Sequence, residues 1–430
     1  MNIAFVAPSP KPFACGGAER LWSHLAQQTS ELTDHQVELI KLPVDERTQG
    51  DLLSAYQAFS ALDLSHFDGI VSGKYPAWMV GHRRHICYVL HRLRGLYDFY
   101  PADARKGCPP SGPHGELMLF LRQYRGDRDG LVRLFELYRE ASTAGEDTEL
   151  VGPLTRKVVH FLDDFALSPM RMWRHFAISH QVADRAGYFP AGSKPEVLHP
   201  PTPLEGLRGG SDDYFFTVSR LDSAKRIDLL IKAFRQVDAD IPFLIAGEGR
   251  ERTWLRNLSV SDKRIRFLGQ VSDKRLRELY GDALAVPFAP LAEDFGLVAL
   301  EAMKSKKPVI TATDSGGPCE LVVDGETGLI AKPTPESLAS AMQDLVDHRR
   351  RARQLGLEAE KSVREIDWPR TISRLFADLE QVNRSSISLA RRPKAVVATT
   401  FPVTPPRQLS IELEDSNRAA VLRRSHREGG

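Results

Sequence analysis

The chain has 430 residues, of which 42% are hydrophobic and 27% charged, and its formal net charge at pH 7 is +2. This length suits two domains of ordinary size, and the composition is that of a globular protein with an adequate core. The small net charge argues against nucleic-acid binding over the whole molecule, and the four scattered cysteines indicate neither a zinc site nor a disulfide framework.

The location predicted from these features is the cytoplasm. Scattered cysteines suit a reducing compartment. The apolar N-terminal run MNIAFVAPSP is typical of a first strand, because it lacks the charged region that opens a signal peptide. No uncharged run reaches the roughly 18 apolar residues of a membrane span. Peripheral association with the inner face of a membrane stays open.

Strands and helices alternate through the first half of the chain. A buried-type strand over 3–7 precedes an amphipathic helix over 18–28, and further strands are expected over 36–42, 69–73 and 86–90. Alternation of this kind favours a parallel α/β sheet. Interrupted helical segments fill 101–149, and a strand over 175–179 follows. A stiff linker then marks a domain boundary, with prolines at Pro195, Pro200, Pro201 and Pro203.

Two features lie where predicted strands of this half end. Gly16 and Gly17 occupy the first turn without the G-x-G-x-x-G spacing of a dinucleotide fingerprint, so taken alone they form a plain turn. His91 directly follows the strand over 86–90, and taken alone it is a structural or solvated histidine. Arg92 and Arg94 beside it are either surface charges or contacts to an anionic acceptor.

The second half restarts with a strand over 214–219 and a helix capped by Asp222 or Ser223. Arg220 and Lys225 lie at this strand-to-helix turn. Two cations there add to the positive end of the helix and can hold a pyrophosphate. Further strands are predicted over 243–249, 265–271 and 327–332, and a last helix is predicted over 368–382.

The stretch from 288 to 317, FAPLAEDFGLVALEAMKSKKPVITATDSGG, carries the most specific pattern in the chain. Glu293 lies in a polar loop, and Glu301 lies in a helix-forming run. Seven residues separate the two glutamates. Loop, helix start, strand and glycine turn in this order describe the ligand-binding edge of a parallel sheet. Backbone N–H groups of Gly296 and Leu297 would suit an anion, and the two carboxylates would suit sugar hydroxyls.

EDFGLVALEAM followed by KKPVITATDSGGPCELVVDGETGLI closely resembles the signature of the retaining nucleotide-sugar glycosyltransferases of family 4, which have the GT-B fold. Lys306 and Lys307 stand where a glycine is usual, which should leave the donor site intact. The resemblance extends over most of residues 1–382 and implies an α/β protein with two Rossmann-like domains facing a central cleft. We expect an acceptor-side domain over 1–203, a donor-binding domain over 204–367, a crossover helix over 368–382 and a disordered tail over 383–430.

The resemblance also implies roles for individual residues. Gly16 and Gly17 would lie beside the donor phosphates, His91 would bind the donor sugar, Val271 would lie near the base, and Arg220 and Lys225 would contact the phosphates. The predicted catalytic residues are Glu293, His91, Arg220 and Lys225. The predicted donor-binding residues are Gly16, Gly17, Val271, Asp294, Phe295, Gly296, Leu297 and Glu301.

The reaction implied is transfer of a hexose, with retention, from a nucleotide diphosphate sugar to a hydroxyl of a glycan, lipid-linked or small-molecule acceptor in glycan, polysaccharide or glycolipid synthesis. The donors considered are GDP-mannose and UDP-sugars. The EDFG motif with Val298 and Glu301 resembles that of mannosyltransferases, which favours GDP-mannose. No DxD-type motif lies at a strand end of these elements, so neither a metal nor a cofactor is expected. The variable region 101–157 would shape the acceptor side.

Three alternatives remain open on the sequence. A nucleotide-sugar epimerase of the same fold would form product without an acceptor. An inactive donor-binding scaffold would bind nucleotide without turnover. A dehydrogenase is the weakest alternative, because the dinucleotide fingerprint and its downstream acidic residue are missing.

Overall fold

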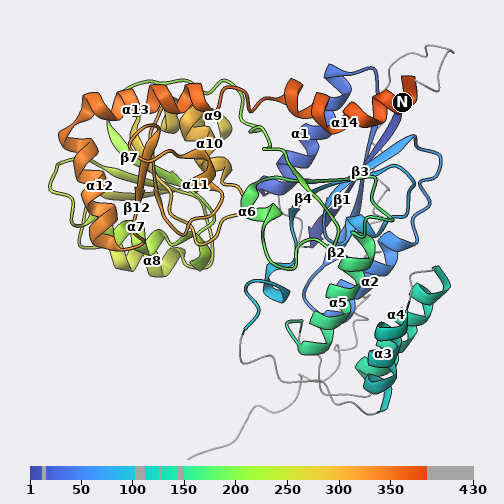
Figure 1. Ribbon diagram of the computed structural model, residues 1–430. Coiled ribbons are helices and arrows are strands. Elements are labelled where there is room, and N and C mark those ends of the chain that lie inside the picture. Colours follow the sequence, from blue (N-terminus) through green and yellow to red (C-terminus); the bar gives the residue numbers. More distant parts are fainter. Residues whose placement is uncertain (12–15, 102–111, 125–127, 144–149, 385–430) are drawn as a thin grey trace, which may run out of the picture.

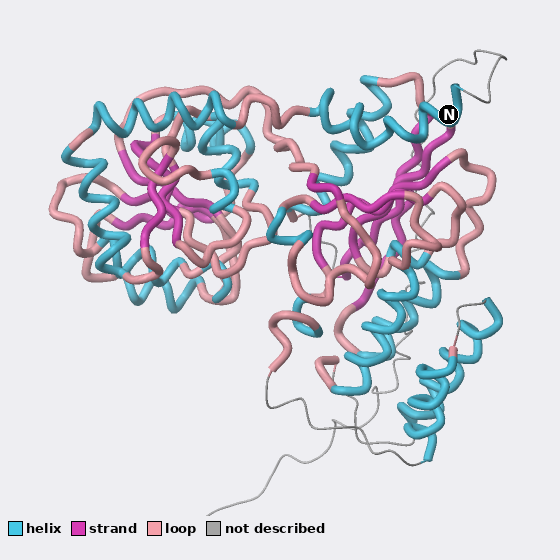
Figure 2. The backbone as a smooth tube through the Cα atoms, in the orientation of Figure 1, coloured by secondary structure: helices cyan, strands magenta, loops and turns pink. Residues whose placement is uncertain are grey.

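The computed structural model describes residues 1–11, 16–101, 112–124, 128–143 and 150–384. These residues form two α/β domains, each built on a parallel sheet with helices on both faces (Figures 1 and 2). The fold class predicted from the sequence is therefore confirmed. The predicted tail over 383–430 lies almost wholly outside the described residues, as do Cys15 and Cys108.

The first domain contains a parallel sheet that has six strands within the described residues, in the order β2-β1-β3-β4-β5-β6. Its strands are β1 (Asn2–Lys11), β2 (Gln36–Asp45), β3 (Gly69–Lys74), β4 (His85–His91), β5 (Arg174–Ala177) and β6 (Glu196–Val197). β1 is buried on both faces from Ile3 to Val6, which is why the strand reads as a continuous apolar run. β1 continues to Lys11, four residues beyond the predicted end, because it pairs with β2 along its whole length.

Helices cover both faces of this sheet. The helices of this domain are α1 (Gly17–Leu32), α2 (Gln49–Ser60), α3 (Gly112–Gln123), α4 (Arg128–Thr143), α5 (Pro153–Ala166) and α6 (His180–Ala183), with short turns η1 (Ala77–Met79) and η2 (Arg94–Leu96). α1 buries Leu21, Trp22 and Leu25 against the sheet, as its spacing predicts. α3 and α4 pair with each other and extend away from the sheet (Figure 1).

The second domain repeats the design with strand order β12-β11-β10-β7-β8-β9. The strands are β7 (Tyr214–Val218), β8 (Phe243–Ala246), β9 (Ile265–Gly269), β10 (Ala283–Pro287), β11 (Val309–Ala312) and β12 (Gly328–Ala331). The sequence runs outward in one direction from β7 and in the other from β10. That order is the doubly wound one, and ligands bind where the two directions part, outside the carboxyl ends of the strands.

Helices of the second domain are η4 (Ser223–Lys225), α7 (Ile227–Phe234), α8 (Arg252–Ser259), α9 (Asp273–Gly281), α10 (Leu297–Lys304), α11 (Pro318–Leu321), α12 (Pro335–Asp347) and α13 (Arg349–Ser362). The sequence predicted a single helix after β7, and this prediction is wrong in one respect. The helix is broken at Arg226, whose φ of 49° lies in the left-handed region and separates η4 from α7.

The last helix, α14 (Trp368–Arg384), returns to the first domain and packs beside α1 (Figure 1). The rings of Phe376 and Phe5 lie 6.3 Å apart, and Arg174 of β5 forms a 2.6 Å ion pair with Asp378. Within the described residues the chain therefore crosses between the domains twice, once between β6 and β7 and once before α14. The domain boundary predicted at the proline-rich linker lies in the first of these crossings. Among the described residues, no helix is both long and apolar enough to cross a membrane.

Candidate active site

The loops that follow β7 and β10 bring Lys225 and Glu293 together at the point where the second sheet changes direction. Nζ of Lys225 donates a 2.6 Å hydrogen bond to Oε2 of Glu293, and the side chains are 14% and 22% exposed. Both groups are therefore held in place while remaining open to a ligand. Two predicted catalytic residues thus meet at the edge of the sheet where parallel α/β proteins bind ligands.

The backbone around Glu293 is held by the neighbouring loop after β11. The N–H of Glu293 donates to the carbonyl of Ser315 at 2.8 Å, and the carbonyl of Glu293 accepts from the N–H of Gly317 at 2.9 Å. This contact requires glycine, because a Cβ at Gly317 would lie 2.4 Å from Cα of Phe295. The glycine pair read in the sequence as a backbone-exposing turn thus lets two loops of the site approach each other.

α10 begins directly after this loop. Gly296, its N-cap, has a φ of 92°, and a Cβ there would lie 2.8 Å from Cγ of Pro318. The first-turn N–H groups of Leu297 and Val298 have no partner within the helix, because the i−4 carbonyls lie before its start. These donors and the positive end of the helix suit a phosphate.

Glu301 lies one turn further along α10, where both of its carboxylate oxygens already accept hydrogen bonds. Thr202 donates to Oε1 at 2.7 Å and Tyr280 donates to Oε2 at 2.8 Å. Burial raises the pKa of this carboxyl, and the two donors oppose that shift. Each oxygen keeps a second lone pair, so further hydroxyl groups can still donate to Glu301.

Arg220 and Val271 lie at the carboxyl ends of β7 and β9, the strands that flank β8. The Arg220 side chain is 80% exposed, and its nearest ion pair is with Asp222 at 3.6 Å. Val271 is half-buried. Arg220 is thus not part of the Lys225–Glu293 pair, and its predicted contact with a phosphate remains a prediction.

Gly17 and His91 approach this region from the first domain. A Cβ at Gly17 would lie 4.0 Å from Cδ1 of Leu297, so the start of α1 faces the start of α10. Gly16 caps α1, and its N–H donates to Oε2 of Glu19 at 3.0 Å. The structure therefore brings two predicted donor-binding residues, Gly17 and Leu297, side by side across the domain interface.

His91 ends β4, and Nδ1 of its ring lies 2.9 Å from the carbonyl oxygen of Arg92. A carbonyl only accepts, so Nδ1 carries the proton and Nε2 keeps its lone pair. Burial lowers the pKa of this imidazole, which favours the neutral form. A neutral Nε2 can accept a hydrogen bond from a sugar hydroxyl.

Arg92 does not have either role considered for it in the sequence. Its side chain is fully buried beneath the sheet edge, with Nη1 2.6 Å from the hydroxyl of Tyr97 and 3.1 Å from Oδ1 of Asp164. The carboxylate of Asp163, also buried, lies 3.9 Å from the same nitrogen. The sequence did not indicate that Arg92 is buried, because an arginine that follows a strand usually lies at the surface.

Asp294 joins the two domains, which the sequence did not indicate. The side chain of Arg185, which follows α6, donates to Oδ1 of Asp294 and to the carbonyl of Ala292, the latter at 3.0 Å. The hydroxyl of Ser179 donates to the backbone carbonyl of Asp294. The residue predicted to bind the donor therefore fixes the loop of Glu293 against the first domain. Arg185 lies just after α6, and no spacing in the sequence distinguished it from a surface charge.

A second set of contacts closes the interface beside this one. The carboxylate of Glu320 accepts from the backbone N–H groups of His180 and Gln181 at 2.8 and 2.5 Å, so it caps α6 of the opposite domain. A cavity of about 430 Å³ lies between α6 and the loops after β10 and β11, lined by Arg185, Ala292 and Asp314 among others. The domain interface therefore holds an open, polar space next to Glu293.

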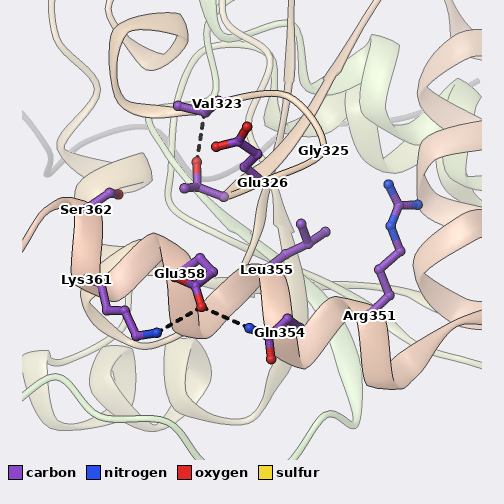
Figure 3. A pocket seen from close by; sticks show the side chains of 10 residues that line it. Val323, Gly325, Glu326, Arg351, Gln354, Leu355, Glu358, Lys361 and Ser362 are labelled. Atoms are coloured by element: carbon purple, nitrogen blue, oxygen red, sulfur yellow. Dashed lines mark hydrogen bonds and ion pairs between the residues drawn. The ribbon is translucent and has the colours of Figure 1, made fainter.

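A larger hollow of about 620 Å³ lies elsewhere, between α13 and the loop before β12 (Figure 3). Gln354 and Lys361 of α13 both donate to Oε1 of Glu358 at its floor. This loop precedes β12, so the hollow lies at the amino ends of the strands. Ligands of doubly wound sheets bind at the carboxyl ends, so we do not assign the hollow to the active site.

In the part of the chain that the structure describes, no three His, Cys, Asp or Glu side chains gather closely enough to hold a metal ion. The expectation that the protein needs no metal or other cofactor stays a prediction.

Comparison with known proteins agrees with this geometry. Residues 205–362 match the family model described as Glycosyl transferases group 1. The chain is 30% identical over 151 residues to an uncharacterized glycosyltransferase of Methanocaldococcus jannaschii, covering 34% of this chain and 42% of that protein. It is 25% identical over 175 residues to an alpha-1,3/1,6-mannosyltransferase of Dictyostelium discoideum, covering 35% and 41%. The chain thus matches about two fifths of the length of these relatives.

The solved structure of Anabaena HepE with UDP and glucose superposes on 89% of this chain and 100% of its own, with a TM-score of 0.58 and 16% identity. At that identity the likeness defines the fold alone. The chain has the GT-B fold, and residues 205–362 form a glycosyl transferases group 1 domain.

Proposed function

We propose that the protein is a retaining glycosyltransferase of family 4, which transfers a hexose from a nucleotide diphosphate sugar to an acceptor hydroxyl. The observation that carries the proposal is the Lys225–Glu293 pair at the switch point of the second sheet, beside the start of α10. A cation, a carboxylate and a helix N-terminus are the groups that a sugar diphosphate needs.

The nucleotide diphosphate gains negative charge as it leaves the sugar. Nζ of Lys225 and the first-turn N–H groups of α10 lie where they can stabilise that charge, and Arg220 can swing in from the surface to join them. Binding of the donor would draw Lys225 from Glu293 to the phosphates. The freed carboxylate of Glu293 would then accept hydrogen bonds from sugar hydroxyls and balance the positive charge that develops on the ring.

The first domain supplies the other side of the sugar. His91, with Nε2 as an acceptor, would bind a hydroxyl of the donor sugar, and Gly16 and Gly17 would allow the phosphates and the acceptor to approach α1 closely. Glu301 would take the ribose hydroxyls through its remaining lone pairs. We infer front-face transfer, in which the leaving phosphate assists the incoming hydroxyl, because no carboxylate is assigned as a nucleophile on the opposite face of the sugar.

The donor class follows from the relatives as a proposal. One relative is named as an alpha-1,3/1,6-mannosyltransferase, and HepE was solved with UDP and glucose. GDP-mannose and UDP-glucose are accordingly the first donors to test. The proposed acceptors are glycans, lipid-linked sugars or small molecules in glycan, polysaccharide or glycolipid synthesis, used in the cytoplasm or at the inner face of the membrane.

The test is a screen of nucleotide sugars for binding and slow hydrolysis, with a chelator present and no acceptor. The expected result is tight binding of one donor and slow release of its free nucleotide. Binding without release would favour an inactive scaffold, and conversion of one nucleotide sugar to its epimer would favour an epimerase. The screen is repeated without the chelator. Nucleotide release that occurs only without the chelator would overturn the expectation that no metal is needed.

A further inference from the structure

Two residues in the left-handed region flank the Lys225–Glu293 pair. Arg226 directly follows Lys225 with a φ of 49°, and Ala292 directly precedes Glu293 with a φ of 46°. Side chains other than glycine adopt this conformation rarely, and they keep it only where the surrounding contacts enforce it. The contacts that enforce it here converge on the side chain of Arg226.

The guanidinium of Arg226 makes four hydrogen bonds to three partners. Nε donates to the carbonyl of Ala289 and Nη2 to the carbonyl of Pro290, each at 2.8 Å. Nη1 and Nη2 also bind the two carboxylate oxygens of Asp314 at 2.8 and 2.7 Å. This bidentate contact has fixed geometry, and it holds the pKa of Asp314 below its usual range.

These bonds join the loops after three neighbouring strands. Arg226 comes from the loop after β7, the two carbonyls belong to the loop after β10, and Asp314 belongs to the loop after β11. The backbone carbonyl of Asp314 in turn accepts from the N–H of Ala292 at 2.9 Å. The Arg226 side chain is 17% exposed and that of Asp314 is 38% exposed, so most of the arginine side chain is shielded from solvent where these bonds form.

We propose that Arg226, together with Asp314, is a positioning residue that sets where the carboxylate of Glu293 lies relative to Lys225. Arg226 acts through the backbone from Ala289 to Ala292, which leads directly into Glu293. This inference rests on the proposed function. It adds two residues that neither the sequence pattern nor the comparisons assign to the site.

The physical reason is that a charged group accelerates a reaction only when it is already aimed at the charge that develops. Functional side chains need to be held within about 0.5 Å of the productive position. In the proposed function, Lys225 and the start of α10 bind the phosphates of the donor, whereas Glu293 and its loop bind the sugar. Loss of the Arg226 contacts should therefore lower kcat and leave nucleotide affinity nearly unchanged.

The experiment compares wild type with Arg226→Ala, Arg226→Gly, Arg226→Lys and Asp314→Asn. The probes are hydrolysis of UDP-glucose or GDP-mannose, whichever the wild type turns over, and binding of UDP or GDP. We expect kcat to fall at least tenfold in the Ala and Gly variants, with nucleotide Kd within threefold of wild type. Arg226→Lys and Asp314→Asn retain part of these contacts, so their kcat should lie between that of Arg226→Ala and that of wild type. Arg235→Ala, an exposed position after α7, is the matched control.

Arg226→Gly separates the side chain from the backbone, because glycine adopts the positive φ without cost. If that variant keeps kcat within twofold of wild type, the inference is wrong. A lower melting temperature with unchanged kcat per folded molecule would show that the contacts are structural only, which also overturns it. If Arg226→Ala fails to fold, Asp314→Asn decides by the same criteria. Failure of the wild type to turn over any donor would instead overturn the proposed function, and this inference with it.

Discussion

Lys225 and Glu293 are 68 residues apart in the sequence, yet Nζ of one lies 2.6 Å from Oε2 of the other. The topology brings them together, because β7 and β10 are adjacent in the sheet although they are separated in the chain. Each charge neutralises the other in the absence of a ligand. A diphosphate would compete for the ammonium, and sugar hydroxyls would compete for the carboxylate, so donor binding exchanges one set of partners for another.

Replacement of Lys225 by alanine should weaken binding of UDP or GDP at least tenfold, because a charge-assisted contact to phosphate is lost and Glu293 is left unpaired. Binding of the corresponding nucleoside, which lacks phosphates, should change little. Isothermal titration with diphosphate and nucleoside checks both. Lys232→Ala is the control, since Lys232 lies on α7 and pairs with Asp228 at the surface. Equal losses for nucleoside and diphosphate would contradict the phosphate role.

Replacement of Glu293 by glutamine should leave the fold intact and lower turnover about 100-fold or more, which is the scale of losing one preorganised charge in a transition state. Glutamine retains the size of the side chain and removes the negative charge. The measurement is kcat for donor hydrolysis, with circular dichroism to verify folding. Glu336→Gln, at an exposed position in α12, should behave as wild type. Turnover of Glu293→Gln within threefold of wild type would exclude the charge as the source of catalysis.

The sequence predicted the two sheets well, because the buried parts of parallel strands such as 3–7 and 243–246 are continuous apolar runs. The predicted strand over 243–249 extended three residues too far, into the glycine turn that follows β8. The sequence did not predict the helices α5, α8 and α13. α13 carries many charged residues, so its apolar stripe is narrow, and α5 lies in a region where no strand signal framed it. Helices of this kind are stabilised by tertiary packing rather than by local preference.

Within the site, residues with a local motif were predictable and residues with only long-range contacts were not. Glu293, Gly296 and Lys225 stand beside turns that mark strand ends. Arg226 and Asp314 were present in the same stretches, but their roles depend on three loops meeting in space. No spacing along the chain encodes that meeting, since 88 residues separate the two partners.

The loop after β11 approaches the loop after β10 at Gly317. The φ of Gly317 is −49°, so a substitution there tests close packing alone and not backbone strain. A Cβ at Gly317 would lie 2.4 Å from Cα and 2.5 Å from the carbonyl oxygen of Phe295, and both are backbone atoms that cannot rotate away. Gly317→Ala should therefore displace the loop of Glu293, destabilise the fold by about 1–3 kcal/mol and reduce donor hydrolysis. Urea denaturation and kcat are the readouts.

Gly95→Ala is the matched control for this substitution, because a Cβ at Gly95 meets nothing within 4 Å. Its unfolding free energy should stay within about 0.5 kcal/mol of wild type. If the two alanine variants are equally stable and Gly317→Ala hydrolyses donor normally, the close contact between the loops is not needed for the site.

His85 gives the pH dependence of stability a defined sign. Its ring is buried at the start of β4, with Nε2 2.7 Å from Oγ of Ser72 and Nδ1 3.1 Å from the carbonyl of Val80. Burial, with His82 nearby adding repulsion, lowers the pKa of His85 from 6.5 to about 3. Below pH 6.5 the unfolded chain therefore takes up a proton that the folded chain does not, so stability falls as the pH falls.

From pH 7.5 to pH 5.0 this single group should cost about 2 kcal/mol, at roughly 1.4 kcal/mol per pH unit below 6.5. His85→Gln cannot titrate, so its unfolding free energy should fall by about 2 kcal/mol less than that of wild type over the same interval. The variant will be less stable at pH 7.5, and only the difference between the two pH values is diagnostic. His66→Gln, at an exposed position, should keep the wild-type slope. A slope for His85→Gln equal to that of wild type would mean that His85 titrates alike in the folded and unfolded chain, which its two hydrogen bonds and its burial argue against.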